Sequence, residues 1–309
     1  MQKKATLQNE PWIRFSTMEN KRETQLMEIM DWATSNDDIR AVLLTSSLVN
    51  PYAPVDQFSD LDIEFVVSNL QQFLSDDSWV ENFGKKIAMI VENEEAFEGK
   101  HAMRMVFYED YTKVDYKIYS VDKFLEEVNN EELQEDWDVG YKVLLDKDDI
   151  TKNMKPPTYN AVMVKKPTEQ EFTTLFNDFW WDMTYVAKCL WRDDLFYAKF
   201  MLEDNMRTQY FQKMIEWHIG LEHNWNVSTN KKGRLFKKYL SPEMWKKIEA
   251  TFSGSDIQDN WRALFAYADI GTELGTAMSQ KLGYAYPAEL DSKIRNYLNH
   301  VKSMEGKDS

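Results

Sequence analysis

The chain has 309 residues and a formal net charge of −15, with 52 acidic against 37 basic side chains. Such a surface repels phosphates and anionic membranes, so we expect neither nucleic acid nor a membrane as a partner. A lone cysteine, Cys189, excludes an internal disulfide, and no apolar run approaches the roughly 18 residues that cross a bilayer. The first residues lack the apolar core of a secretory signal. Together these features favour a cytoplasmic protein.

The first half of the chain is predicted to mix helices with strands. Apolar residues recur at helical spacing near the start, and short apolar or alternating runs bounded by turn residues follow. The predicted helices are 18–35, 70–74 and a segment after Asp77, and the predicted strands are 39–44, 58–67, 102–107 and 113–119. This pattern predicts a unit in which helices cover a sheet.

The second half is predicted to be almost wholly helical. Adjacent prolines at 156 and 157 interrupt regular structure, and a capping-box pattern begins at Thr168. Aromatic and apolar residues then recur at helical spacing through 172–186, and further helices are expected from about Phe196, Pro242, Asp256 and Asp291. We therefore predict an α+β protein with a mixed-sheet domain at 1–155 and a helical bundle domain at 156–309.

Two aspartates in the strand 58–67 are the most informative feature of the sequence. Asp60 and Asp62 are two residues apart, so a strand turns both to one face, roughly 7 Å apart. Carboxylates this close repel each other, and a divalent cation relieves that repulsion. A third acid, Asp115, lies mid-strand between apolar neighbours, where an isolated carboxylate is costly unless it is paired or bound to metal. The three acids predict a site for Mg²⁺ and a nucleotide phosphate.

The order of these features resembles the nucleotidyltransferase superfamily, and in detail the aminoglycoside 6-adenylyltransferases. The likeness runs in order over nearly the whole chain, which is more specific than any single motif. The segments that carry it are 56–63, 113–115, 145–148, 177–180, 185–188, Arg192, 228–231 and 282–287.

The resemblance implies transfer of AMP from ATP to a hydroxyl of a streptomycin-like aminoglycoside, with release of pyrophosphate. By position, Asp60 and Asp62 would bind metal, and Asp115 would either complete the metal site or accept the proton of the attacking hydroxyl. Ser47, with Ser46 beside it, would contact the terminal phosphates. The helical domain would supply part of the nucleotide and acceptor sites.

Candidate residues in the helical domain come partly from the same likeness and partly from side-chain chemistry. Lys188, Arg192 and Lys231 are candidates for contacts with the triphosphate, although on spacing alone a solvated helix face is the better interpretation. Asp178, Asp182 and Trp181 are candidates for a cationic acceptor, because carboxylates and indole faces suit ammonium and guanidinium groups. The expected protein is a monomer that binds ATP, Mg²⁺ and a cationic small molecule.

One departure from the family pattern keeps other functions open. The family usually has Gly-Ser-Arg at the turn after the first strand, and this chain has Ser46-Ser47-Leu48. Glycine lets the backbone approach a phosphate closely, and Leu48 removes a cation. The alternatives are a catalytically impaired nucleotide-binding or regulatory homologue, and a nucleotidyltransferase with an acceptor that is not an antibiotic.

Overall fold

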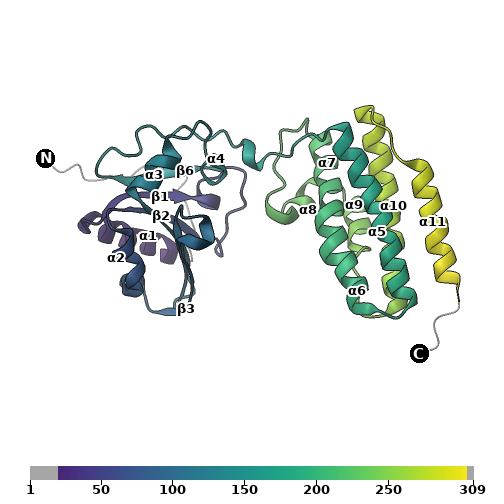
Figure 1. Cartoon of the computed structure of the whole chain (residues 1–309), viewed down its shortest axis with the longest axis horizontal. Helices are drawn as coiled ribbons and strands as arrows, with labels where there is room; N and C mark the ends of the chain where they lie inside the picture. The colour runs from purple at the N-terminus through teal and green to yellow at the C-terminus, as the bar shows by residue number, and fades with distance from the viewer. Residues whose placement is uncertain (1–19, 305–309) are drawn as a thin grey trace. The chain divides into compact units, whose positions relative to one another are not determined.

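A computed structural model describes residues 20–304 of the chain and divides it into two compact units, Met1–Ala161 and Val162–Ser309 (Figure 1). The expected domain boundary after residue 155 lies in the irregular segment just before this division. The expected first helix starts two residues before the described part, which begins with α1 (Asn20–Ser35). None of the helices in the described range has the length and apolar character to cross a membrane.

The first unit is built on a six-stranded mixed sheet with strand order β3-β4-β5-β2-β1-β6. Its central pair, β2 and β5, is parallel, and every other neighbouring pair is antiparallel. Four of the strands match the predicted ones, whereas β3 and β6, the two edge strands, were not predicted. The bounds are β1 (Ile39–Thr45), β2 (Leu61–Val67), β3 (Lys86–Glu92), β4 (Ala102–Tyr108), β5 (Lys113–Ser120) and β6 (Tyr141–Asp146).

Helices cover both faces of this sheet (Figure 1). On one face, α1, α2 (Leu70–Ser75) and a 3-10 turn at Asp77–Phe83 enclose a core that includes Ile63, Phe65 and Tyr116. On the other face, α3 (Val121–Val128) and α4 (Glu135–Asp138) cover a smaller cluster around Val66 and Trp137. Because side chains alternate along a strand, the even-numbered residues of β2 and the odd-numbered residues of β5 share this second face. The α+β prediction is confirmed.

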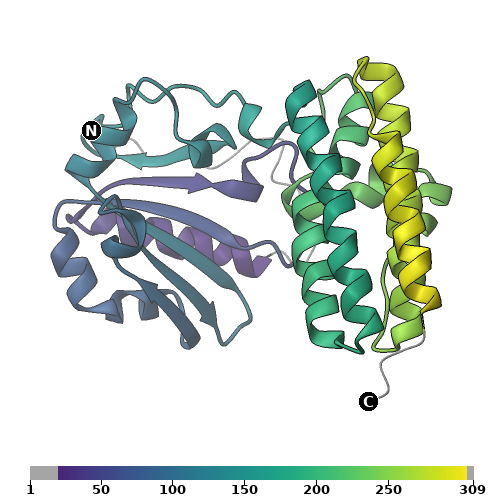
Figure 2. The same ribbon diagram turned by 45° about the vertical axis from the view of Figure 1, so that its right-hand side comes forward.

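The second unit is helical throughout its regular structure, and its long helices α5, α10 and α11 pack side by side (Figure 2). The helix expected from about Phe196 is divided into three consecutive elements: a short α-helix, an unusual π-helix and a second α-helix. The bounds are α5 (Glu169–Trp191), α6 (Leu195–Lys199), π-helix η5 (Phe200–Phe211), α7 (Gln212–Glu222), α8 (Phe236–Tyr239), α9 (Pro242–Glu249), α10 (Ile257–Leu282) and α11 (Ala288–Ser303).

Helix α5 begins and packs as its sequence predicts. The Thr168 hydroxyl accepts a hydrogen bond from the Glu171 amide at 3.2 Å, and the Glu171 carboxylate accepts one from the Thr168 amide at 2.7 Å, which confirms the capping box. Phe176, Phe179 and the other predicted apolar positions are buried. A Cβ at Gly271 of α10 would lie 2.5 Å from the Phe179 ring, so glycine there permits the close approach of α10 to α5.

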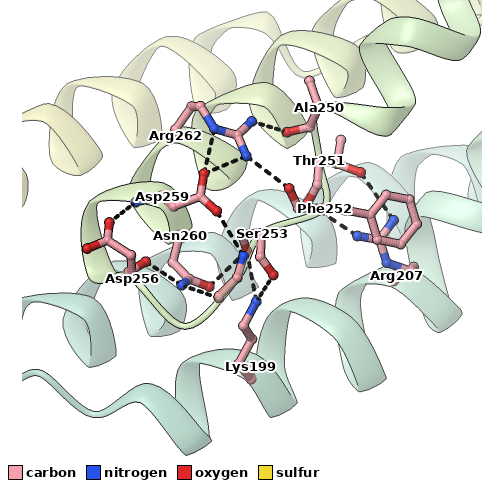
Figure 3. Close-up of polar contacts among 11 residues, drawn as sticks. Lys199, Arg207, Ala250, Thr251, Phe252, Ser253, Asp256, Asp259, Asn260 and Arg262 are labelled. Atoms are coloured by element: carbon pink, nitrogen blue, oxygen red, sulfur yellow. Dashed lines mark hydrogen bonds and ion pairs between the residues drawn. The ribbon is translucent and has the colours of Figure 1, made fainter.

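The connection between α9 and α10 contacts the π-helix and the residue just before it (Figure 3). The Lys199 ammonium, one residue before the π-helix, donates to the carbonyl oxygen of Ser253 at 2.7 Å. Within the π-helix, the Arg207 guanidinium donates to the Thr251 hydroxyl at 3.1 Å and lies 3.7 Å from the centre of the Phe252 ring. These contacts fix a segment whose backbone pairing is rare in proteins.

Candidate active site

The parallel pairing of β2 with β5 brings the three predicted carboxylates together. Asp62 and Asp115 are register partners in this pair, so their side chains emerge side by side on the same face. Asp60 immediately precedes β2 and lies within ion-pair distance of the same lysine as Asp115. The three acids therefore cluster where both strands begin.

The loop before β2 is fastened to α1, which places Asp60. One guanidinium nitrogen of Arg22 donates to the carbonyl oxygens of Asp56 and Ser59, at 2.9 and 3.0 Å. The Ser59 hydroxyl in turn accepts a hydrogen bond from the Asp56 amide at 2.9 Å. A folded loop of this kind presents Asp60 at a fixed position although it lies outside the strand.

Lys113, the first residue of β5, is part of this cluster and was missed by the sequence analysis as a site residue. Its ammonium donates to Asp60 Oδ2 at 3.0 Å and to Asp115 Oδ2 at 2.8 Å. These hydrogen bonds raise the pKa of Lys113 despite the opposing effect of burial. Its position two residues before Asp115 on a strand was the available signal, because i and i+2 share a face.

The carboxyl of Asp62 has a raised pKa. Burial raises the pKa of its carboxyl to about 6, the negative charge of Asp115 adds to the shift, and a hydrogen bond from Ser46 opposes it. A carboxylate in this state gains strongly from a nearby cation, since the cation offsets both the lost hydration and the repulsion.

The turn after β1 supplies the Ser46 contact at a conformational cost. Ser46 has φ of +62°, the left-handed region that favours glycine, and it opens the 3-10 turn η1 (Ser46–Leu48). Ser47 and Leu48 follow on that turn, and both are half-buried. The structure thus gives a physical reason for glycine at position 46 in the family pattern, and it also shows that serine contributes a hydrogen bond to Asp62.

The donor set suits a hard divalent cation that binds together with a phosphate. Asp115 Oδ1 is buried and has no hydrogen-bond partner, so it is a free acceptor inside the cluster. Among residues 20–304, no group of three His, Cys, Asp or Glu side chains converges closely enough to hold an ion by itself. Mg²⁺ usually takes only one or two protein carboxylates and completes its shell with water and substrate phosphates, so these residues fit it.

A buried ion pair lies directly behind the carboxylates on the same face of the sheet. Glu64 and Lys117 are register partners on β2 and β5, 2 % and 9 % exposed, with 3.6 Å between their charged atoms. The Trp137 indole donates to Glu64 Oε2 at 2.8 Å, and Lys117 donates to Asp136 at 2.8 Å. Burial raises the pKa of Glu64, and the Lys117 charge opposes that rise. Glu64 was not predicted as a site residue, although it continues the alternation of Asp60 and Asp62.

In the second unit, Asp178, Trp181 and Asp182 lie on α5. Asp178 is exposed, Trp181 is 62 % exposed, and Asp182 is half-buried. Asp182 Oδ2 accepts hydrogen bonds from Asn205 at 2.6 Å and from the Tyr210 hydroxyl at 2.9 Å.

Both of these donors come from the π-helix, and sequence patterns gave no sign of them. Asn205 and Tyr210 are five residues apart, a spacing that in an α-helix separates side chains by roughly 140°. The i→i+5 pairing of a π-helix turns them to one side, where both reach Asp182. Burial raises the pKa of Tyr210, and its hydrogen bond to Asp182 adds to that shift. The π-helix therefore fixes the position of one acceptor candidate.

A surface pocket of about 520 Å³ lies beside these residues. It is lined by the first turns of α5 and by Tyr210, Lys213 and Trp217 from the opposite side. Tyr210 thus borders the pocket and also holds Asp182.

The basic candidates of the second unit lie at two places, the end of α5 and the short turn that begins at Lys231. Lys188 Nζ lies 4.2 Å from the centre of the Tyr185 ring on α5. Arg192 is exposed and is the residue that caps the end of α5, one position beyond the helix. Lys231 is exposed in a short turn where Lys232 and Gly233 have positive φ.

Comparison with known proteins places this chain in a family. The family model described as streptomycin adenylyltransferase matches residues 18–301. An aminoglycoside 6-adenylyltransferase of Bacillus subtilis (strain 168) is 31 % identical over 290 residues, covering 91 % of this chain and 98 % of that protein. One from Campylobacter jejuni is 29 % identical over 281 residues, covering 90 % and 94 %. A crystal structure of an aminoglycoside 6-adenyltransferase from Bacillus subtilis is 26 % identical, with a TM-score of 0.45, and the likeness covers 94 % of this chain and 100 % of that one.

Proposed function

Because the chain belongs to the streptomycin adenylyltransferase family and is therefore a nucleotidyltransferase, we propose that it transfers AMP from ATP to a hydroxyl of a streptomycin-like aminoglycoside and releases pyrophosphate. The observation that carries this proposal is the register pairing of Asp62 with Asp115, together with the ion pairs through which Lys113 links Asp115 to Asp60. Such a cluster is a requirement of metal-assisted phosphoryl chemistry.

The cofactor proposed is Mg²⁺, for which Asp60, Asp62 and Asp115 are the candidate ligands together with substrate phosphates. The support is the raised pKa of Asp62 and the partnerless Asp115 Oδ1, both of which favour a bound cation. When bound, Mg²⁺ would neutralise negative charge on the phosphate oxygens.

The protein's own groups bind, orient and move the proton. Ser46 and Ser47 offer hydroxyl and backbone donors to the phosphates. The acceptor oxygen forms a bond to the α-phosphorus as the bond from phosphorus to the pyrophosphate oxygen breaks. The proton of the acceptor hydroxyl passes to a carboxylate, for which Asp115 is the candidate where Asp60 and Asp62 hold the metal without it.

In the second unit, Lys188, Arg192 and Lys231 are the proposed contacts for the triphosphate. Asp178, Asp182 and Trp181 are the proposed contacts for the cationic acceptor. The hydrogen bonds that hold Asp182 support its part, since a fixed carboxylate loses little conformational entropy when it binds a guanidinium.

A second candidate function is nucleotide binding without catalysis. It is favoured by the left-handed Ser46, where a side chain occupies the place of the family's glycine, and by Leu48, which has no charge to offer a phosphate. This candidate predicts ATP binding with no turnover on any acceptor.

The test is mass spectrometry of streptomycin incubated with ATP, Mg²⁺ and the protein, with assay of pyrophosphate. Added mass of one AMP, absent with Asp60→Asn and retained with the exposed helix variant Asp31→Asn, supports the transferase. ATP binding without an adduct on a panel of aminoglycosides supports the second candidate instead. An adduct that persists with Asp60→Asn refutes the assigned site.

A further inference from the structure

Lys113 places its ammonium against two of the oxygens that the proposed metal needs. Nζ lies 3.0 Å from Asp60 Oδ2 and 2.8 Å from Asp115 Oδ2, so one cation spans two of the three acids. Lys113 is two residues before Asp115 on β5, hence on the same face of the sheet.

An ammonium and a divalent ion compete for these oxygens. Both offset the repulsion among Asp60, Asp62 and Asp115, but the carboxylate lone pairs that accept hydrogen bonds from the lysine are those that would coordinate metal. The two cations would also repel each other at contact distance. Occupation by one therefore disfavours occupation by the other.

The lysine side chain has the freedom to leave. Lys113 starts its strand and its side chain is 37 % exposed, so the ammonium can swing on a flexible four-carbon stem without disturbing the sheet. Asp115 is less exposed, at 17 %, and stays on the strand.

We propose that Lys113 is an exchangeable counter-cation of the carboxylate cluster. In the metal-free protein its ammonium holds Asp60 and Asp115 together. When a divalent cation is bound, the ammonium leaves their oxygens and is free to contact an anionic phosphate of the substrate. This inference rests on the proposed function for the identities of the metal and the substrate. What it adds is the exchange of the lysine ammonium for the divalent cation.

The first experiment measures Mn²⁺ affinity without ATP or acceptor, by electron paramagnetic resonance of the free ion. Lys113→Met keeps the length of the side chain and removes the charge, and we expect at least about tenfold tighter binding, since removing a close like charge favours an ion even after screening. Lys85→Met is the matched control, because Lys85 makes an exposed ion pair with Glu109 at 2.8 Å in the same unit. Equal or weaker binding by Lys113→Met overturns the proposal.

A second measurement uses the wild-type chain and decides the question if Lys113→Met does not fold. Reductive methylation with isotope-labelled formaldehyde is quantified at Lys113 by mass spectrometry, with Lys85 as internal reference. Mg²⁺ alone should increase labelling of Lys113 relative to Lys85, because an amine released from two carboxylates is more accessible to the reagent. Unchanged or decreased labelling at saturating Mg²⁺ overturns the exchange.

The two proposals fail separately. Metal-dependent release of Lys113 in a protein that transfers AMP to no aminoglycoside refutes the proposed function and leaves the exchange intact. Transfer of AMP to an aminoglycoside without metal-dependent release of Lys113 refutes the exchange and leaves the proposed function intact.

Discussion

Removing the charge of Lys117 tests the buried pair that lies behind the carboxylates. Lys117→Met keeps the volume of the side chain but leaves Glu64, 2 % exposed, with the Trp137 indole as its remaining hydrogen-bond donor. Breaking a buried pair from one side typically costs about 3–5 kcal/mol, because an uncompensated charge stays in a poorly solvated place. We expect about 3 kcal/mol here, since Glu64 can also escape by taking up a proton.

The pH dependence of this loss has a definite sign. Burial already raises the pKa of Glu64, and the Lys117 charge opposes that rise, so the variant should have a still higher folded-state pKa. A carboxyl with a raised folded-state pKa destabilises the fold above that pKa and ceases to do so as the pH falls through it. The cost of Lys117→Met should therefore be largest at alkaline pH and shrink on acidification.

Hydrogen exchange of peptides from β2 and β5, measured in urea at several pH values, reports the local free energy of opening. A local measurement is needed because a chain of two units need not unfold in one step. The double variant Glu64→Gln/Lys117→Met is the control, because glutamine still accepts the Trp137 hydrogen bond and carries no charge. We expect it to recover most of the loss. A cost below about 1 kcal/mol for Lys117→Met, or a cost independent of pH, would refute the reasoning.

Three further outcomes follow from the site. Because burial and Asp115 raise the pKa of Asp62 to about 6, Asp62→Asn should stabilise the metal-free protein more at pH 8 than at pH 5, where the acid is already protonated. Equal shifts of the melting temperature at both pH values would contradict this. Tyr210→Phe should raise the KM for the aminoglycoside about tenfold, the value of one hydrogen bond to a charged group, and leave the KM for ATP unchanged. Tyr197→Phe, at an exposed tyrosine, is the control, and equal rises in both KM values would argue against an acceptor role. Ser46→Gly combined with Leu48→Arg should lower the KM for ATP or raise kcat, because glycine relieves the φ of +62° and arginine adds a cation; no change in ATP kinetics would show the two departures to be harmless.

Local patterns in the sequence were sufficient for several features. The strand pattern places Asp62 in β2, whereas Asp60, predicted on the same strand, lies one residue before it. Helical spacing with a capping box predicts α5 and its buried face. The two missed strands are edges: β3 exposes Ile87, Ile90 and Val91, and β6 is half-buried along its length. Both strands contain short apolar runs, at 87–91 and 143–145, and periodicity alone does not distinguish such a run from a helical segment.

Sequence alone determined that acids occupy particular strand positions, because the period of a strand is a local property of the backbone. Only the tertiary structure decided that Asp62 pairs with Asp115, that the Lys113 ammonium lies between two acids, and that a π-helix turns Asn205 and Tyr210 toward Asp182. Strand register and side-chain ion pairs depend on residues far apart in the chain, and their free energies are set by packing and burial that no single segment encodes.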